Sequence, residues 1–480
     1  MANAPYKEAQ DPGPSAATAR RRVATATIVG SALEWYDFYL YASMAALVFG
    51  KIFFPQTDGA TGTMAAFATF AAGFLARPLG GILFGHLADR IGRRNVLIIT
   101  FVLMGVSTGL IGLLPTYGTA GLAAPVALVV LRIFQGLGAG AEYSSAAVVA
   151  YEHADENRRG RQGAWPALGL NLGLLMSSLT VTVLTMLDEE VLLSWGWRVP
   201  FVASFALAGV GLWVRRRVPE SRDFHDSQKK QEQDAAPQMP FVTLLRKERR
   251  GLLVVLAVSL GYNALSYIFK TFSLAYLSDF QDVSASVGAF GITLASATAL
   301  VTVPVFGWAS DRFGSRRVLA AGGIASALFA FPFFVLLDTG NSILIWLCLI
   351  IATGLLAPAM FAPQGSLLSR QFPPDVRVSG VGTGREIGAA LSGGLAPLAA
   401  LAIVGASATN ATWGVSLLLV AAAVVVVAGA AFDRGSPSAS SPVARDCGTG
   451  LPPARHRTGT TSARAKPTED WFEYQAPRVQ

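Results

Sequence analysis

The sequence predicts an all-α membrane protein of twelve transmembrane helices, arranged as two pseudo-symmetric six-helix bundles with the N- and C-termini in the cytoplasm. The 480 residues are 52% apolar and only 14% charged, whereas soluble domains carry about 25% charged residues. The apolar residues fall in blocks of roughly 20, the length that crosses about 30 Å of hydrocarbon as a helix. One loop motif also occurs twice, at matching places in the two halves of the chain.

Six apolar blocks precede a polar segment and six follow it. The first six spans are expected at residues 23–47, 62–86, 95–114, 122–148, 163–186 and 198–214. The second six are expected at residues 251–276, 286–306, 317–337, 343–367, 379–405 and 412–432. The chain thus divides into a cytoplasmic tail (1–22), an N-terminal bundle (23–214), a linker (215–250), a C-terminal bundle (251–432) and a second tail (433–480).

The polar segments are not expected to cross the membrane. The linker is rich in Arg, Lys, Gln and Asp and cannot bury enough apolar area to fold alone, so it is expected in the cytoplasm. The second tail is rich in Pro, Ser, Thr, Arg and Gly and is expected to be disordered. The first tail is polar, and no small-residue cleavage site ends the apolar block after it, which predicts an uncleaved first span.

The placement of Lys and Arg predicts the orientation in a bacterial inner membrane. Two of the 38 Lys and Arg residues, Lys51 and Arg198, are expected in external loops. Four more are expected within spans: Arg77, Arg132, Lys270 and Arg385. The remaining 32 lie on the cytoplasmic side, as the positive-inside rule requires. The net charge of +8 therefore reflects membrane orientation, and no nucleic-acid partner is expected.

The repeated motif follows the second and the eighth spans. It reads Gly85-His-Leu-Ala-Asp-Arg-Ile-Gly-Arg-Arg94 in the first copy and starts at Gly307 in the second, with Asp89 and Asp311 lying 222 residues apart. A carboxylate at the membrane edge needs a partner, which a helix N-terminus or an Arg would supply. A turn shaped only by topology is the alternative, but two copies at matching places favour a shared role.

This motif resembles the signature loop of the major facilitator superfamily. In that superfamily the loop is implicated in closing the cytoplasmic gate. The resemblance therefore assigns a gate role to the residues of the first copy and to the two charged residues of the second: Gly85, Asp89, Arg90, Gly92, Arg93 and Arg94, and Asp311 and Arg312.

Three further stretches are similar to the metabolite:proton symporter family, which includes carriers of shikimate, 2-oxoglutarate, citrate, and proline or betaine. They read Glu34-Trp-Tyr-Asp-Phe-Tyr-Leu-Tyr41, Phe74-Leu-Ala-Arg-Pro-Leu-Gly-Gly81 and Trp195-Gly-Trp-Arg-Val-Pro-Phe201. The likeness covers about residues 23–432 and implies the major facilitator fold, a proton-coupled carrier and a monomer. The chain departs at Gly140-Ala-Glu-Tyr143, where relatives often carry Gly-Gly-Glu-Trp, and its tail lacks the heptads of osmosensing proline/betaine carriers.

Ionisable groups within spans are costly when unpaired and are functional candidates by default. Glu34, Asp37 and Tyr41 share one face of the first span. Two carboxylates on one face in a low dielectric do not both ionise easily, so one can take and release a proton. Asp37 is the first choice for proton coupling, with Glu34 second, and the alternative is that either acid pairs with an Arg to hold helices together.

The fourth span carries Arg132 near its middle, with Glu142 and Tyr143 nearer the cytoplasm. Arg132 heads an Arg-x-x-Gln-Gly pattern that resembles a superfamily motif linked to proton transfer. We therefore expect Arg132 in proton coupling and in substrate binding, with Tyr41, Glu142 and Tyr143 also binding substrate. The alternative for Arg132 is an ion pair with Asp37 or another acid.

The seventh span carries a polar stripe formed by Asn263, Tyr267 and Lys270. In substrate binding, Lys270 would anchor a carboxylate; alternatively, it snorkels to the external interface. The resembled fold places spans one, four, seven and ten around a central cavity, and three of these carry the charges named above. Arg77 on span two and Arg385 and Glu386 on span eleven are expected in the cytoplasmic gate or in inter-helix pairing.

The charges within the spans favour an anionic or zwitterionic cargo. The expected function is uptake of a small organic acid with a proton, and the alternatives are a proline/betaine-type zwitterion symporter, an exporter or a non-transporting sensor. The four His residues lie at span ends, in loops or in the tail, and no nucleophile or phosphate-binding motif occurs, so neither an enzyme nor a metal or other cofactor is expected. The expected partners are the cargo, the proton and the lipid bilayer.

Overall fold

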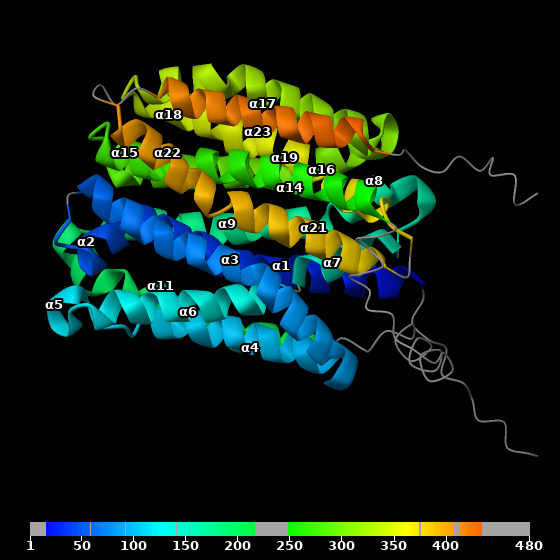
Figure 1. Cartoon of the computed structure of the whole chain (residues 1–480), viewed down its shortest axis with the longest axis horizontal. Helices are drawn as coiled ribbons and strands as arrows, with labels where there is room; N and C mark the ends of the chain where they lie inside the picture. The colour runs from blue at the N-terminus through cyan, green and yellow to red at the C-terminus, as the bar shows by residue number, and fades with distance from the viewer. Residues whose placement is uncertain are drawn as a thin grey trace, which may run out of the picture. The chain divides into compact units, whose positions relative to one another are not determined.

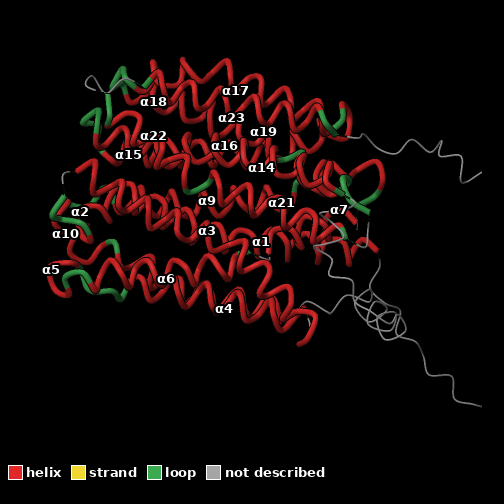
Figure 2. The backbone as a smooth tube through the Cα atoms, in the orientation of Figure 1, coloured by secondary structure: helices red, strands yellow, loops and turns green. Residues whose placement is uncertain are grey.

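The computed structural model describes residues 16–57, 59–91, 93–140, 142–152, 154–216, 248–373, 376–407 and 412–433, and every regular element in these ranges is helical (Figures 1 and 2). The predicted linker falls largely outside these ranges, as do most of the first tail and almost all of the second. The first helix begins at Ala16, earlier than the predicted start at residue 23.

The N-terminal helices lie within residues 16–216. They are α1 (Ala16–Met44), the π-helical turn η1 (Ala45–Phe49), α2 (Gly50–Phe53), α3 (Gly59–Ile91), α4 (Arg93–Ile111), α5 (Tyr117–Ala120), α6 (Ala123–Ala139), α7 (Glu142–Glu152), η2 (Glu156–Arg158), α8 (Arg159–Gly163), α9 (Trp165–Leu184), α10 (Glu189–Val191), η3 (Leu192–Gly196) and α11 (Arg198–Arg216).

The C-terminal helices lie within residues 248–433. They are α14 (Arg249–Tyr267), the π-helical turn η4 (Ile268–Phe272), α15 (Ser273–Asp279), α16 (Ala285–Phe313), α17 (Ser315–Leu337), α18 (Ser342–Leu349), η5 (Ile350–Leu356), α19 (Ala357–Phe361), α20 (Gln364–Ser369), α21 (Arg377–Ser392), α22 (Leu395–Gly405) and α23 (Trp413–Ala431).

Eight helices of the described part are long and apolar enough to cross a membrane, which confirms the multi-pass membrane class. They cover 60–84, 159–184, 249–279, 285–313, 315–337, 342–369, 377–405 and 413–431. A pair bent by 42°, 189–196 with 198–212, would make a ninth, and Ile98–Ile111 and Ala123–Ala139 are shorter apolar helices. The count of twelve and the division into two bundles stay predictions.

The predicted eleventh span is interrupted between α21 and α22, where two glycines meet α3. A Cβ on Gly393 would lie 2.8 Å from the ring of Phe74, and one on Gly394 would clash with Ala71. The missing side chains therefore let α3 pack into the junction between α21 and α22. Close approach through glycine is typical of membrane helices, which pack without an aqueous hydrophobic drive.

The helices run side by side in Figure 1. Helices α4, α6 and α11 pack together on one side, α17, α18 and α23 pack on the other, and α1, α3, α9, α14 and α21 lie between them. The N-terminal helices meet the C-terminal helices chiefly where α9 packs on α16 and α3 packs on α21 and α22. This interface is where the sequence predicts the transport site.

Side-chain contacts close the interface at both ends. At the end that holds Lys51 in α2 (the label α2 is at the left in Figure 1), the hydroxyls of Thr182 and Thr293 are 2.9 Å apart, and Asp279 accepts a hydrogen bond from Thr63. At the opposite end, where Asp311 lies against α8, helices α7 and α8 (right in Figure 1) contact α16, α20 and α21. The structure is therefore occluded, with cross-interface contacts at both ends.

Candidate functional site

An aromatic layer fills the middle of the interface between α1, α3 and α14. The ring of Tyr267 lies 6.1 Å from that of Tyr39, 5.5 Å from that of Phe70 and 5.3 Å from that of Phe74, measured between centroids. Edge and tilted ring contacts of this kind pack closely in a dry interior. The charged side chains predicted on the first, fourth and seventh spans border this layer.

Asp37 is buried inside the N-terminal helices, only 7% exposed. Ser204 of α11 donates a hydrogen bond to its Oδ1 at 2.8 Å, and Thr108 of α4 donates one to its Oδ2 at 3.0 Å. Each hydroxyl has a second acceptor in its own helix, the Pro200 carbonyl for Ser204 and the Met104 carbonyl for Thr108. Both hydroxyls can thus turn away when the carboxylate is neutralised.

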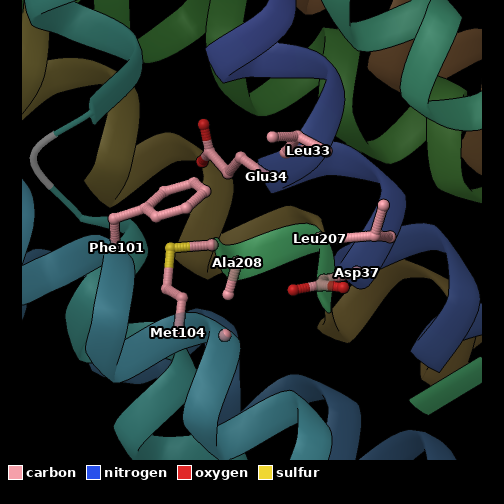
Figure 3. Close-up of a pocket in the computed structure, with 8 residues that line it drawn as sticks. Leu33, Glu34, Asp37, Phe101, Met104, Leu207 and Ala208 are labelled. Atoms are coloured by element: carbon pink, nitrogen blue, oxygen red, sulfur yellow. The ribbon is translucent and has the colours of Figure 1, made fainter. Parts of the chain in front are cut away.

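A small pocket lies beside Asp37 between α1, α4 and α11 (Figure 3). Its lining residues come from the N-terminal helices: Leu33, Glu34, Asp37, Phe101, Met104, Gly105, Leu207 and Ala208. Figure 3 shows Glu34 and Asp37 on the same helix, α1, with Phe101 and Met104 of α4 also lining the pocket. The pocket gives space next to both acids, but it does not lie between the N-terminal and C-terminal helices.

Asp37 connects to Arg132 through two neutral side chains. Thr108, which donates to Asp37, accepts a hydrogen bond at 2.9 Å from Nε2 of Gln135, and Oε1 of Gln135 accepts one from Nη1 of Arg132. The ion pairs found among the described residues do not join Asp37 and Arg132 directly. The predicted alternative of a direct pair is therefore replaced by a chain of donors that ends on the carboxylate.

Arg132 is fully buried among aromatic rings. Its guanidinium carbon lies 4.2 Å from the ring centroid of Tyr41, 4.5 Å from that of Phe38 and 4.9 Å from that of Phe70. Nε and Nη2 have no hydrogen-bond partner within the part of the chain that the structure describes. Aromatic faces attract the guanidinium cation but do not provide a hydrogen-bond acceptor for every N–H group. Nε and Nη2 of Arg132 can therefore still donate hydrogen bonds to a bound ligand.

Lys270 lies in the π-helical turn η4 and is 3% exposed. Its Nζ donates a hydrogen bond at 3.1 Å to the hydroxyl of Tyr39 on α1 and lies 5.1 Å from that ring centroid. An ammonium held across the interface in this way favours the interior position over snorkelling to the membrane surface. π-helical turns often occur at functional sites.

The other two residues of the polar stripe are also buried. Nδ2 of Asn263 donates to the Ser259 carbonyl of its own helix at 2.7 Å. The hydroxyl of Tyr267 has no hydrogen-bond partner among the described residues. The structure thus brings Tyr267 and Lys270 to the aromatic layer, whereas the amide of Asn263 is bound to its own helix.

Arg77, Arg385, Glu34 and Glu386 form a buried ion cluster. Nε of Arg77 donates to Glu386 at 2.6 Å, and Nη2 of Arg77 lies 3.6 Å from Glu34. Nη1 of Arg385 donates to Glu386 at 2.7 Å. The cluster joins α1 and α3 to α21, as the predicted inter-helix pairing requires.

Asp311 meets a helix start across the interface at its end of the molecule. It accepts hydrogen bonds from the backbone N–H groups of Gly160 at 2.6 Å and Arg161 at 3.3 Å, and lies 3.6 Å from Nε of Arg161. Asp311 thus has both a helix start and an Arg as partners, whereas the partner expected for Asp89 stays a prediction, because the side chain of Asp89 is outside what the structure describes. Arg312 is exposed and lies over the Trp308 and Phe313 rings instead.

Several predicted residues lie outside what the structure describes. Residue 92 is outside the described ranges, and so are the side chains of the other first-copy gate residues and of two predicted substrate residues: Asp89, Arg90, Arg93, Arg94, Glu142 and Tyr143. Gly85 has only its helical backbone described. Their roles stay predictions.

Four residues that contact the candidate site were not predicted from the sequence: Tyr39, Thr108, Gln135 and Ser204. Tyr39 and Gln135 stand inside the motifs quoted above, so their positions carried a signal. Thr108 and Ser204 carried none, because a hydroxyl in a membrane helix can bond to its own helix and needs no special context. Within the described residues no group of three or more His, Cys, Asp or Glu side chains is placed to hold a metal ion.

Comparisons with known proteins agree with the resemblance found in the sequence. Residues 23–239 match the family model "Sugar (and other) transporter", and residues 271–472 match "Major Facilitator Superfamily". The chain is 36% identical to the shikimate transporter of Escherichia coli (strain K12) over 395 residues, which cover 82% of this chain and 90% of that relative. It is 33% identical to the proline/betaine transporter of the same strain over 416 residues, which cover 85% and 82%.

Solved structures show the same fold. The crystal structure of a D-xylose-proton symporter superposes with a TM-score of 0.66 at 17% identity, covering 86% of this chain and 97% of that one. The xylose transporter XylE from E. coli in a partially occluded inward-open conformation superposes with a TM-score of 0.63 at 20% identity, covering 86% and 96%. The helical fold, the matched family models and the identity to full-length carriers lead to one conclusion. The chain belongs to the major facilitator superfamily, within the group of metabolite transporters that its sequence resembles.

Proposed function

We propose that this secondary transporter takes up a small organic acid together with a proton by alternating access. It would work as a monomer in a bacterial inner membrane, with both termini in the cytoplasm and twelve spans in two bundles. Asp37 carries the proton, and Lys270, Arg132 and Tyr267 bind the acid. No metal or other cofactor and no nucleic acid takes part.

The burial of Lys270 is the observation that carries the choice of cargo. Its ammonium is 3% exposed, and its described contacts are to the hydroxyl and ring of Tyr39 rather than to a carboxylate. A buried cation is costly unless an opposite charge compensates it. A carboxylate on the cargo would supply that charge at the interface between the N-terminal and C-terminal helices.

Arg132 and Tyr267 offer further donors around the same aromatic layer. Nε and Nη2 of Arg132 and the hydroxyl of Tyr267 have no partner among the described residues. Buried donors are normally satisfied, so these groups are suited to hydroxyl or carboxylate oxygens of a cargo. Tyr41, Asn263, Glu142 and Tyr143 complete the proposed binding set, the last two on sequence grounds alone.

Coupling would run along the chain from Asp37 to Arg132. When Asp37 is charged, the hydroxyl of Thr108 points its hydrogen at the carboxylate, and Gln135 and Arg132 align behind it. Protonation removes the strongest acceptor, so Thr108 can turn to its second acceptor, the Met104 carbonyl. The same event would weaken the hydrogen bond between Gln135 and Arg132 and leave the guanidinium of Arg132 available to the transported acid.

A proline- or betaine-type zwitterion is the second candidate. It is favoured by the 33% identity to the proline/betaine transporter of E. coli over most of both chains. A zwitterion also carries a carboxylate for Lys270, but its cationic group would need an acid or an aromatic face. The aromatic layer could provide the face.

An uptake panel in proteoliposomes separates the two candidates. The purified chain is reconstituted with an inward proton gradient and supplied with labelled shikimate, 2-oxoglutarate, citrate, proline or glycine betaine. The proposal expects accumulation of an acid that a protonophore abolishes. Accumulation of proline or betaine alone would favour the second candidate, and protonophore-insensitive uptake would overturn the coupling claim.

A further inference from the structure

The buried ion cluster contains one Arg and one Glu from each side of the interface. Arg77 and Glu34 come from the N-terminal helices α3 and α1, and Arg385 and Glu386 come from the C-terminal helix α21. All four side chains are at most 3% exposed. The charges of the cluster therefore balance within each side of the interface, one Arg against one Glu.

Arg77 has an acid on both sides of the interface. Its closer partner is across the interface, where Nε and Nη2 donate to the two oxygens of Glu386 at 2.6 and 3.4 Å. Glu34, on its own side, lies 3.6 Å from Nη2, beyond hydrogen-bond distance. Glu386 likewise keeps a base on its own side, because Arg385 donates to it at 2.7 Å.

The position of Glu386 along its span decides which opening separates the pair. It follows Arg377, the first residue of α21, by nine residues, whereas the span continues through α22 to Gly405. Arg377 lies at the Asp311 end, where it pairs with Glu152 across the interface. The Arg77–Glu386 pair is therefore on the Asp311 side of the span's middle and must part when that end opens.

Parting a buried ion pair is strongly unfavourable if it leaves a charge without a partner. If opening at this end left Arg77 and Glu386 without partners, the open state would be high in free energy in every transport cycle. A second partner for each charge on its own side removes that penalty. The cluster supplies those two partners, Glu34 for Arg77 and Arg385 for Glu386.

We propose that Arg77 exchanges Glu386 for Glu34 when the interface opens at the Asp311 end, while Glu386 stays with Arg385. Glu34 is thus a resting partner for Arg77 in the open state, a positioning role distinct from proton coupling. The exchange keeps every charge paired in both states and sets the balance between them. This inference rests on the alternating access of the proposed function and is independent of its cargo and its proton.

Opposite responses of the two glutamates test the exchange. Glu386→Gln removes the partner that Arg77 uses in the occluded state, so Arg77 pairs with Glu34 and the population of the open state increases. Glu34→Gln removes the partner that Arg77 uses in the open state, so the population of the occluded state increases. A static clamp that merely holds the interface shut predicts instead that both substitutions raise the open population.

The populations can be measured by double electron–electron resonance on the full chain in nanodiscs, without cargo or a proton gradient. Cys348 and Cys447 are first replaced by Ser, and nitroxides are attached at the exposed positions Asn157 and Pro373, which lie on opposite sides of the interface near the Asp311 end. A second pair at the exposed positions Gln56 and Ser284 reports on the Lys51 end.

Glu386→Gln is expected to raise the ratio of long to short Asn157–Pro373 distances by roughly tenfold or more, because a buried pair is lost only in the occluded state. Glu34→Gln is expected to keep the short distances and, added to Glu386→Gln, to cancel the rise. Glu152→Gln is the matched control. It removes the same charge from a cross-interface pair whose acid is 38% exposed, and exposed pairs contribute little.

Long distances in both single variants, or no change in either, would overturn the exchange. If Glu386→Gln does not yield monodisperse protein, Glu386→Asp and Glu34→Asp replace the pair, because each keeps the charge but withdraws it from Arg77. The same opposite signs are expected with smaller amplitude. A failed uptake panel leaves this measurement intact, since it uses no transported compound.

Discussion

Thr108 of α4 donates its single hydroxyl hydrogen to the carboxylate of Asp37 of α1 while it accepts a hydrogen bond from Gln135. This one hydroxyl therefore connects the proposed proton site with the residue that holds Arg132. Among the described residues the hydrogen-bond donors to this carboxylate are the neutral hydroxyls of Thr108 and Ser204, and a buried carboxylate held in this way is more readily neutralised than one held by a direct ion pair. The arrangement suits an acid that must gain and lose a proton in each cycle.

Replacing Asp37 with Asn should abolish accumulation but leave exchange. The amide keeps the shape and can still bond to Ser204 and Thr108, but it cannot carry a proton. Uptake against a gradient and counterflow of the same labelled acid are measured side by side in proteoliposomes. Accumulation at the wild-type level would remove Asp37 from the coupling mechanism.

Thr108→Val should slow proton-driven uptake by about tenfold, because leaving a buried polar group unpaired costs about 1–3 kcal/mol. Val has nearly the shape of Thr, so packing is retained while the link from Gln135 to Asp37 is cut. Thr108→Ser restores the hydroxyl and is the matched control. Equal rates for the Val and Ser variants would show that the hydroxyl has no part in coupling.

Lys270→Met should raise the KM for the transported acid by roughly 10- to 100-fold, since a hydrogen bond to a charged group contributes about 1.5–3 kcal/mol. Met fills the same volume and leaves the contact with the ring of Tyr39. The measurement is initial uptake rate against acid concentration. An unchanged KM would show that the cargo carboxylate binds elsewhere, with Arg132 as the next residue to vary.

Gly160→Ala should favour opening at the Asp311 end. A Cβ at this position would lie 2.6 Å from Oδ1 of Asp311 and 2.7 Å from the Gly307 carbonyl oxygen, so α8 and α16 must separate. Labelling of a cysteine at the exposed Asn157 by a water-soluble maleimide checks this, with Gly209→Ala as the control. A Cβ at Gly209 meets nothing within 4 Å. Equal labelling of both variants would contradict a gate at Asp311.

Much of the architecture was predictable because it follows from composition and repetition. Apolar blocks of membrane length predicted the multi-pass class, and the paired motifs predicted the superfamily, which the comparisons confirm. These inferences rest on local sequence, and local sequence was sufficient for them.

The partners of the buried charges were not predictable in the same way. Arg77 and Glu386 are 309 residues apart, and only tertiary packing shows that they meet. The sequence placed Glu34 and Asp37 on one face, yet Glu34 lies near Arg77 and Asp37 accepts hydrogen bonds from Thr108 and Ser204. The partners of each acid depend on which helices pack against α1 next to that residue.

Cargo-driven proton entry is the most direct test of proton-coupled uptake by this chain. Proteoliposomes holding a pH-sensitive dye are given the acid that the uptake panel identifies, with protein-free liposomes correcting for passive entry. Proton-coupled uptake predicts that the lumen acidifies as the acid enters through the wild-type chain, and that Asp37→Asn abolishes this acidification. Entry of the acid through the wild-type chain with no change in luminal pH would contradict proton-coupled uptake.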